Sequence, residues 1–411
     1  MKKIETWKKT FGWILSGQAF SIIGSGAAQF ALIWWITTTT GSPMALTLAA
    51  VAGFLPQALV GPFAGVWVDR LGRKAVMMAA DGFVALVSAI LGIGFIAGVA
   101  TVEWIYAALM LRAVGTAFQM PAAQAVLPLL APPEALTKVN GWSQFIQSGG
   151  MMAGPVLGAL ALEGLGMAGV MAIDVAGALL AIGTLVFIKI PELTKRAEKP
   201  HVGREMLAGL RVLTRHKALM ALSIPVLLCM LVYVPVGSLF PLMVNGHFGG
   251  NAWHSSMVEL AFAAGMLLCS AALGIWGGAK RQFLMISLGI AGFGVFLMVS
   301  GFLPSWAIWI FVGLSLLMGA AGNLFSVPFM AYVQGAVPPE TLGRVMSMIT
   351  TAMALATPVG LFIAGPVAQA IGIAPWFAYS GGAIILIGLL CQGMTRRYER
   401  GTSVLEEQTE R

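Results

Sequence analysis

Residues 65–74 read Gly-Val-Trp-Val-Asp-Arg-Leu-Gly-Arg-Lys, and they separate two apolar stretches that are each long enough to cross a bilayer. The charges in this segment are one acid and three bases: Asp69, Arg70, Arg73 and Lys74. Charged side chains are costly beside lipid unless they face water or one another. Gly65 and Gly72 permit close packing and a tight turn. The segment therefore predicts a short charged loop between two membrane helices, at the cytoplasmic surface.

The composition of the whole chain agrees with a membrane location. The 411 residues are 58% hydrophobic and only 10% charged, whereas soluble domains have about 25% charged residues. A membrane helix needs about 20 apolar residues, and twelve stretches qualify: 11–37, 44–68, 75–99, 104–127, 137–162, 167–190, 219–244, 254–276, 283–302, 305–329, 341–370 and 375–393. Backbone groups in lipid must be paired internally, and the long apolar runs do not alternate as barrel strands do. We predict an all-α membrane protein with twelve transmembrane helices.

The positive charges predict the orientation. If the N-terminus is cytoplasmic, 23 of the 24 Lys and Arg residues fall on the inner side, and only Arg112 lies within a helix. Both termini are then cytoplasmic. The net charge of +8 reflects this topology and contact with anionic lipid, not nucleic-acid binding. The first apolar stretch is too long for a signal peptide, so we expect a retained membrane helix.

A polar linker and a weak repeat divide the chain into two halves. Ala131-Pro-Pro-Glu-Ala-Leu matches Val337-Pro-Pro-Glu-Thr-Leu, and Ala153-Gly-Pro-Val matches Ala364-Gly-Pro-Val. Such a repeat indicates two pseudo-symmetric six-helix bundles. The predicted parts are an N-terminal bundle, a cytoplasmic linker, a C-terminal bundle and a cytoplasmic tail, over 1–190, 191–218, 219–393 and 394–411. Residues 204–216 form either an amphipathic helix at the inner membrane surface or a solvated linker helix.

Several function classes are disfavoured. The chain has no Gly-x-x-x-x-Gly-Lys-Ser/Thr loop for ATP and neither a His-Glu-x-x-His nor a Gly-x-Ser-x-Gly motif. Cys229, Cys269 and Cys391 stand alone in apolar stretches, without metal-ligand spacing. We therefore expect no metal, no cofactor and no enzymatic activity.

Ionisable residues inside the membrane stretches are the main functional candidates. Arg112 is the only deep base, and Asp174 and Glu259 are acids well inside predicted helices. A carboxylate can exchange a proton as its access alternates, whereas Arg keeps its proton. We predict proton coupling with Asp174 as first choice of carrier, Glu259 as second and Arg112 as tuner. The alternatives are that Arg112 is a structural partner of a buried acid and that Glu259 is interfacial.

Polar and soft side chains recur at helical spacing on several of the predicted helices. Such stripes face a cavity or another helix and not lipid. The predicted substrate cavity is lined by Gln18, Ser21, Ser25, Gln29, Thr116, Gln119, Met230, Tyr233, Met346, Thr350, Met353 and Thr357. Ordinary packing is the alternative for each of these residues.

Two motifs resemble those of the major facilitator superfamily. The loop Gly-x-x-x-Asp-Arg-x-Gly-Arg-Lys resembles its signature between helices 2 and 3, which implies a cytoplasmic latch that controls rocking of the two halves. The implied latch residues are Gly65, Asp69, Arg70, Gly72, Arg73, Lys74 and Asp81, the last pairing with Arg73 or Lys74; a positive-inside anchor is the alternative. The run from Gly150 through Gly154 and Pro155 to Gly158 resembles the antiporter motif of drug exporters, with Ala159 in place of the final Gly; generic helix packing is the alternative.

The first 190 residues further resemble the macrolide-efflux exporters. The matching pieces are Trp7-Lys8 with Gly17-Gln18, Thr40-Gly41-Ser42, Gly53-Phe54-Leu55-Pro56, Ala80-Asp81, residues 112–118 with Pro121-Ala122, Leu136-Thr137-Lys138, Ser143-Gln144 with Gln147-Ser148, and Ala172-Ile173-Asp174-Val175. The resemblance implies proton-driven export of an amphipathic drug-like compound, macrolide-like or another hydrophobic molecule, from the cytoplasm. We expect a monomer in the bacterial inner membrane. The rivals are a dedicated exporter of one natural product, siderophore or lipid, and a membrane sensor or scaffold without transport.

Overall fold

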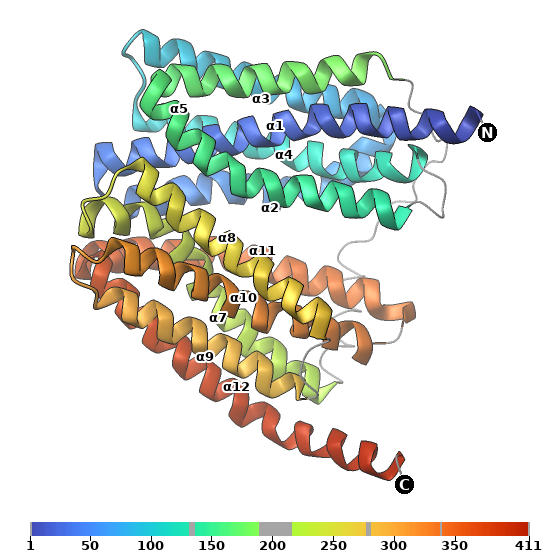
Figure 1. Ribbon diagram of the computed structural model, residues 1–411, viewed down its shortest axis with the longest axis vertical. Coiled ribbons are helices and arrows are strands. Elements are labelled where there is room, and N and C mark those ends of the chain that lie inside the picture. The colour runs from blue at the N-terminus through green and yellow to red at the C-terminus, as the bar shows by residue number, and fades with distance from the viewer. Residues whose placement is uncertain (1, 131–135, 189–215, 277–280, 338, 410–411) are drawn as a thin grey trace. The chain divides into compact units, whose positions relative to one another are not determined.

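The computed structural model describes residues 2–130, 136–188, 216–276, 281–337 and 339–409, and all regular secondary structure in these ranges is helical (Figure 1). The chain divides into two compact units. The first consists of Met1–Gly41 and Leu48–Lys199, and the second of Ser42–Thr47 and Pro200–Arg411.

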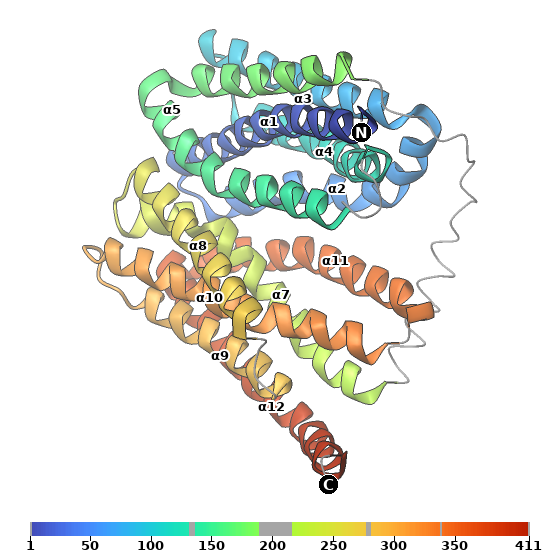
Figure 2. The same ribbon diagram turned by 45° about the vertical axis from the view of Figure 1, so that its right-hand side comes forward.

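The first unit is built around four helices that pack together. Its helices are α1 (Lys2–Thr40), α2 (Pro43–Leu71, of which the residues up to Thr47 belong to the second unit), α3 (Arg73–Ile96), α4 (Val102–Leu130) and α5 (Leu136–Val186). The α1 helix runs along α5, and α3 packs against both α4 and α5 (Figures 1 and 2). The interior of this unit therefore lies between α1, α3, α4 and α5.

The second unit repeats the all-helical construction. Its elements are α7 (Lys217–Leu242), the π-helix η2 (Met243–His247), α8 (Ala252–Trp276), α9 (Gln282–Gly301), α10 (Ile308–Ala336), α11 (Pro339–Ile371) and α12 (Ile373–Thr409). The α9 helix packs on α10 and α12, while α7 packs on α11 and α12. Its core is aromatic: the Tyr233 ring lies 4.8 Å from that of Phe293, and Phe240 contacts Phe262, Phe311 and Phe377.

Local sequence explains where the first helices end. Gly41 has a φ of 58°, which favours glycine, and its N–H donates to the Thr37 carbonyl at the end of α1. Ser42 then caps α2, since its Oγ accepts from the Ala45 N–H. Gly72 has a φ of 84° and separates α2 from α3. The tight turn expected within residues 65–74 is therefore made at Gly72.

Nine helices among the described residues are long and apolar enough to cross a membrane. One of them, 145–186, is interrupted at Gly166, where φ is 68°, so α5 contains two rods that correspond to the predicted stretches 137–162 and 167–190. The count of twelve stays a prediction.

The predicted polar segments are only partly described. Most of the proposed linker helix over 204–216 falls outside the described residues, and His216 immediately precedes α7. The α12 helix continues to Thr409, so the segment predicted as a tail from residue 394 is helical at least as far as that residue.

The closest helix contact in the first unit is between α1 and α5. A Cβ added at Gly154 would lie 2.9 Å from the Gly26 backbone, and one at Gly158 would lie 2.7 Å from the Ala27 carbonyl oxygen. Only glycine permits this approach, because real Cβ atoms do not come so near a backbone atom. Small residues at helix contacts are the usual means of close packing in membranes.

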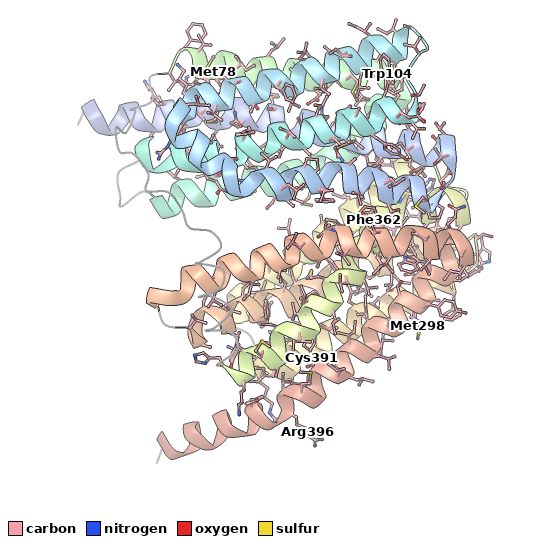
Figure 3. All side chains as sticks on the ribbon, turned by 180° about the vertical axis from the view of Figure 1, so that it is seen from behind. Met78, Trp104, Met298, Phe362, Cys391 and Arg396 are labelled. Carbon is pink, nitrogen blue, oxygen red and sulfur yellow. The ribbon has the colours of Figure 1, made fainter. Side chains whose placement is uncertain are left out.

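Apolar clusters hold the two ends of this unit. Near one end, Met77 and Val126 belong to a buried cluster against which Met78 and Phe118 pack. Near the other, the Trp104 ring covers Gly94, at 3.1 Å from a Cβ placed there. Figure 3 labels Met78 and Trp104 in these two positions.

The glycine contact predicts a position-specific cost. Gly154→Ala would force α1 and α5 apart, and overpacking of this kind costs about 1–3 kcal/mol. We expect a clear fall in the melting temperature of the purified protein in detergent. Gly149→Ala is the matched control, because an added Cβ there meets nothing within 4 Å. Equal melting temperatures for the two variants would contradict the packing argument.

Candidate functional site

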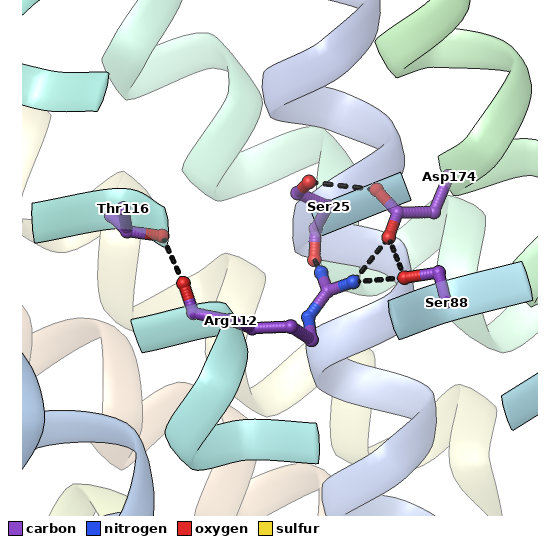
Figure 4. Close-up of polar contacts among 5 residues, drawn as sticks. All are labelled: Ser25, Ser88, Arg112, Thr116 and Asp174. Atoms are coloured by element: carbon purple, nitrogen blue, oxygen red, sulfur yellow. Dashed lines mark hydrogen bonds and ion pairs between the residues drawn. The ribbon is translucent and has the colours of Figure 1, made fainter. Parts of the chain in front are cut away.

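A buried ion pair occupies the interior of the first unit. Arg112 Nη1 on α4 contacts the Asp174 Oδ2 atom on α5, and the two side chains are 6% and 0% exposed. Figure 4 shows the guanidinium directed at this carboxylate. Arg112 is thus the partner of a buried acid, as the structural alternative held, and it is the same acid that the sequence ranks first as proton carrier.

Two serines complete the site. Ser25 Oγ donates to Asp174 Oδ1 at 2.7 Å and Ser88 Oγ donates to Asp174 Oδ2 at 2.6 Å. Arg112 Nη1 also donates to Ser88 Oγ, and Arg112 Nη2 donates to the Ser25 carbonyl at 3.3 Å. Residues from α1, α3, α4 and α5 therefore meet at one carboxylate (Figure 4).

Glycines bring α1 and α5 close enough for the bond between Ser25 and Asp174. A Cβ at Gly24 would lie 3.1 Å from the Asp174 Cα, and one at Gly177 would lie 2.6 Å from the Phe20 carbonyl oxygen. The α1 backbone thus approaches α5 on both sides of the carboxylate. This approach places Ser25 within reach of Asp174.

A cavity of about 490 Å³ lies beside the ion pair, within the first unit. Sites for drug-sized ligands have volumes of roughly 300–1,000 Å³. Six glutamines contribute to its wall: Gln18, Gln29, Gln57, Gln119, Gln124 and Gln147. Asp81 and Arg112 line the cavity, whereas Asp174 is not among its described lining residues.

Asp81 on α3 takes part in a hydrogen-bond chain across this cavity. Gln18 Nε2 donates to Asp81 Oδ2 at 3.3 Å, and Gln119 Nε2 donates to Gln18 Oε1 at 2.5 Å. Asp81 is 5% exposed. This differs from the predicted pairing of Asp81 with Arg73 or Lys74, because no described cation forms an ion pair with Asp81. Asp81 on α3 instead lies in the cavity wall, where it is bonded to Gln18 of α1.

Among the other predicted latch residues, Lys74 bonds to the end of a neighbouring helix. Lys74 Nζ donates to the carbonyls of Val186 and Ile188 at 3.1 and 2.7 Å. These groups lie at the end of α5, where carbonyls lack helical partners and a positive charge is favourable. Lys74 thus joins the start of α3 to the end of α5. The roles predicted for Gly65, Asp69, Arg70 and Arg73 stay predictions, and the side chains of Asp69 and Arg70 lie outside those described.

The predicted antiporter motif lies on α5 against α1. Gly150, Gly154 and Gly158 all face α1, at Ile22, Gly26 and Ala27 respectively. Pro155 is buried inside the helix. The motif therefore forms the close helix contact described above, and a role in exchange stays a prediction.

The predicted cavity residues divide between the two units. Gln18, Ser21, Ser25, Gln29, Thr116 and Gln119 all line the cavity of the first unit. Met230 and Tyr233 lie on α7, and Met346, Thr350, Met353 and Thr357 lie on α11. Within the second unit, Tyr233 is surrounded by Phe262, Phe293 and Phe325, while Thr357 Oγ1 donates to the Met353 carbonyl of its own helix.

Glu259 belongs to a different unit from Arg112 and Asp174, the other two predicted coupling residues. It lies on α8 of the second unit and is partly exposed. Among the described residues it has neither an ion pair nor a hydrogen bond through its side chain. The structure therefore brings together Arg112 and Asp174 but does not add Glu259 to their network.

Sequence analysis missed several residues of the site. Ser88 follows Asp81 by seven positions and so lies on the same face of α3, a spacing that indicates it. Ser143 and Gln147 are four positions apart on α5 and both line the cavity. Gln57 and Gln124 are single polar residues in apolar surroundings, and their spacing gives no comparable signal.

Fold and site together define a multi-pass helical membrane protein with a buried ion pair beside a polar cavity. The family model for the Major Facilitator Superfamily matches residues 14–278. Macrolide efflux protein A from Streptococcus pyogenes is 40% identical over 393 residues, which is 95% of this chain and 97% of that protein. Multidrug efflux pump Tap from Mycolicibacterium fortuitum is 26% identical over 392 residues, 92% and 93% of the two chains.

Solved structures agree on the fold. A POT family transporter crystallised with 5-aminolevulinic acid superimposes with a TM-score of 0.74 at 11% identity and covers 95% of this chain and 96% of its own. The chain belongs to the major facilitator superfamily. The all-α membrane fold and the resemblance to macrolide-efflux exporters are confirmed, and the similarity extends well beyond the first 190 residues.

The ion pair predicts a non-additive response to mutation. Arg112→Met leaves Asp174 buried without its cation, and breaking such a pair costs about 3–5 kcal/mol. The double variant Arg112→Met/Asp174→Leu removes both charges, so we expect it to be more stable than Arg112→Met alone. The measurement is the unfolding of the purified protein in detergent.

Thr116→Val provides the control for this cycle. Thr116 Oγ1 donates only to the Arg112 carbonyl of its own helix, at 3.0 Å, so we expect a loss of less than about 1 kcal/mol. Strictly additive losses for Arg112→Met and Asp174→Leu would show that the two charges are not coupled.

Proposed function

We propose that this protein is a secondary active exporter that moves amphipathic drug-like compounds out of the cytoplasm in exchange for protons. The similarity to macrolide and multidrug efflux proteins along more than nine-tenths of the chain supports drug export. The observation that carries the coupling mechanism is the buried Arg112–Asp174 pair beside the cavity. A scaffold without transport has no need of a charged pair at such a place.

The proposed coupling step is the separation of this ion pair. While Arg112 contacts Asp174, the carboxylate accepts hydrogen bonds from the guanidinium and from two serines. If α4 moves relative to α5, the carboxylate loses its cation in a low-dielectric site, and it then binds a proton instead of remaining charged. Alternating access provides such a movement, because one arrangement of helices is exchanged for another during each cycle.

The remaining parts of the proposal follow from the sequence. The distribution of positive charges supports cytoplasmic termini. We propose that the chain lies in the bacterial inner membrane as a monomer in contact with anionic lipid. The substrate is a small amphipathic molecule, and macrolide-like compounds are the first to test because of the 40% identical relative. Glu259 is the second candidate for the proton carrier.

Asp174→Asn is the central test of coupling. The amide keeps the shape but cannot carry a proton, so we expect loss of proton-driven efflux while substrate still equilibrates down its own gradient. The measurement is substrate-induced acidification change in inside-out vesicles, with Glu259→Gln as a matched acid-to-amide variant. If both variants exchange protons for substrate as the wild type does, the carrier is another residue.

A second experiment addresses the proposed latch. Asp69→Asn or Arg73→Ala should reduce the export rate at least about tenfold, a barrier change of about 1.4 kcal/mol, while substrate binding stays largely intact. The reason is that the loop acts on the movement of the halves and not on the site. Transport rates and equilibrium binding are measured on the same preparations, and normal rates in both variants would leave only the role of a topology anchor.

A drug panel separates the rival functions. Resistance of cells to several chemically distinct compounds favours a multidrug exporter, and resistance or export confined to one natural product, siderophore or lipid favours the dedicated exporter. A complete lack of proton-linked transport with every compound in the panel would favour the sensor or scaffold.

A further inference from the structure

The two buried acids of the first unit have opposite electrostatic environments. Asp174 has an arginine and two serines as partners and does not line the cavity. Asp81 lines the cavity, is 5% exposed, and has one neutral partner, Gln18, at 3.3 Å. A carboxylate has room for about four hydrogen bonds, so Asp81 is poorly satisfied for a buried charge.

Among the described residues, no cation on the neighbouring helices forms an ion pair with Asp81. Arg112 of α4 also lines the cavity, but its guanidinium is paired with the other buried acid, Asp174 on α5. The α1 helix offers only neutral side chains at the cavity, among them Gln18 and Ser21. An uncompensated buried carboxylate is costly, and a cation that enters the cavity relieves that cost.

The hydrogen bonds from Gln119 to Gln18 and from Gln18 to Asp81 run in one direction, and this direction allows a ligand to replace Gln18 as the donor to Asp81. Because Gln18 turns its amide N–H toward Asp81, its Oε1 faces Gln119, which donates to it at 2.5 Å. The bond to Asp81 is the long one, and a charge-assisted bond from an ammonium group is roughly twice as strong as a neutral one. An ammonium group therefore displaces Gln18, whose freed N–H can donate to an oxygen of the same ligand.

The chemistry of the wall excludes a metal ion as the preferred cation. Among the described residues, no group of three or more His, Cys, Asp and Glu side chains is placed to hold one. The wall instead combines glutamine amides, which both donate and accept, with apolar side chains such as Ile22, Phe54 and Val84. Such a wall fits an organic ligand with apolar parts and several oxygens.

We propose that Asp81 is the recognition site for a protonated amine, and that the cavity of the first unit binds amphipathic amines whose oxygens bond to the glutamines. Asp81 is then a specificity-determining residue, distinct from the Arg112–Asp174 pair. The claim that such amines are exported rests on the proposed function. The claim that they bind at Asp81 does not, because binding is measured without transport.

The test compares two probes that differ in one charge. Dansylcadaverine has a free primary amine, and its N-acetyl derivative has the same skeleton without the charge. Binding to the full-length purified protein in detergent is followed by dansyl emission on excitation of tryptophan. We expect the wild type to bind the amine at least about tenfold more tightly than the acetylated probe.

Asp81→Asn should abolish that preference. We expect a rise of at least about tenfold in the Kd of the amine and less than about a twofold change for the acetylated probe. Asp81→Glu should retain the preference, and Glu103→Gln, an acid-to-amide change at an exposed residue in the first turn of α4, should not alter it. Gel filtration establishes that the variants are folded.

Gln18→Lys gives an independent reading of the same site. The introduced ammonium group is tethered next to Asp81 and competes with the probe, so we expect it to remove the preference without removing the acid. This variant keeps the inference testable even if Asp81→Asn fails to fold.

The outcomes separate this inference from the proposed function. The amine site is overturned if Asp81→Asn or Gln18→Lys keeps the tenfold preference for the amine. It is also overturned if the wild type does not favour the amine. If, in either case, Asp81→Asn has lost only proton exchange, Asp81 is a proton site. A wild type that binds with the expected preference but exports nothing in inside-out vesicles contradicts the proposed function and leaves the amine site standing.

Discussion

The first unit depends on the burial of one ion pair. Arg112 and Asp174 are almost completely withdrawn from solvent, and two isolated charges in such a place would cost many kcal/mol. The structure offsets this cost by bonding the carboxylate to Ser25 and Ser88 as well as to the guanidinium. These groups come from four helices. The buried charges are therefore stabilised only when the four helices are packed as they are here, and the contacts among the charges in turn hold the helices together.

Close packing is what makes that arrangement possible. Gly24 and Gly26 on α1 and Gly154, Gly158 and Gly177 on α5 let the two backbones approach more closely than any other residue allows. In a membrane, where apolar side chains gain little by leaving lipid, such contacts and the hydrogen bonds they permit hold helices together. The run that resembles an antiporter motif is thus also the contact that places Ser25 beside Asp174.

Asp174 and Asp81 are chemically identical side chains in different surroundings, and we propose different roles for them for that reason. Asp174 is paired with Arg112 and bonded to two serines, so in the proposed mechanism a change in its partners accompanies helix movement. Asp81 lies in the wall of a cavity of about 490 Å³ with a single long amide bond, so a change in its partners is linked to what enters the cavity. The proposed exchange of protons for an organic cation requires both kinds of response, and we assign them to acids on two different helices of this unit.

The sequence by itself determined the helical membrane class, and it singled out Arg112 and Asp174 as charges deep in apolar stretches; their functional roles stay predictions. Long apolar runs leave the backbone no other way to satisfy its hydrogen bonds in lipid, and a deep charge is too costly to be incidental. The stripe from Gln18 to Gln29 was also readable, because residues three or four apart share one face of a helix. Only the tertiary structure decided which acid Arg112 holds, that Lys74 bonds to the end of α5, and that Asp81 belongs to the cavity and not to a pair with Lys74. Those outcomes depend on which helices pack together and how closely, and a pattern along one helix has no information about the distance to another.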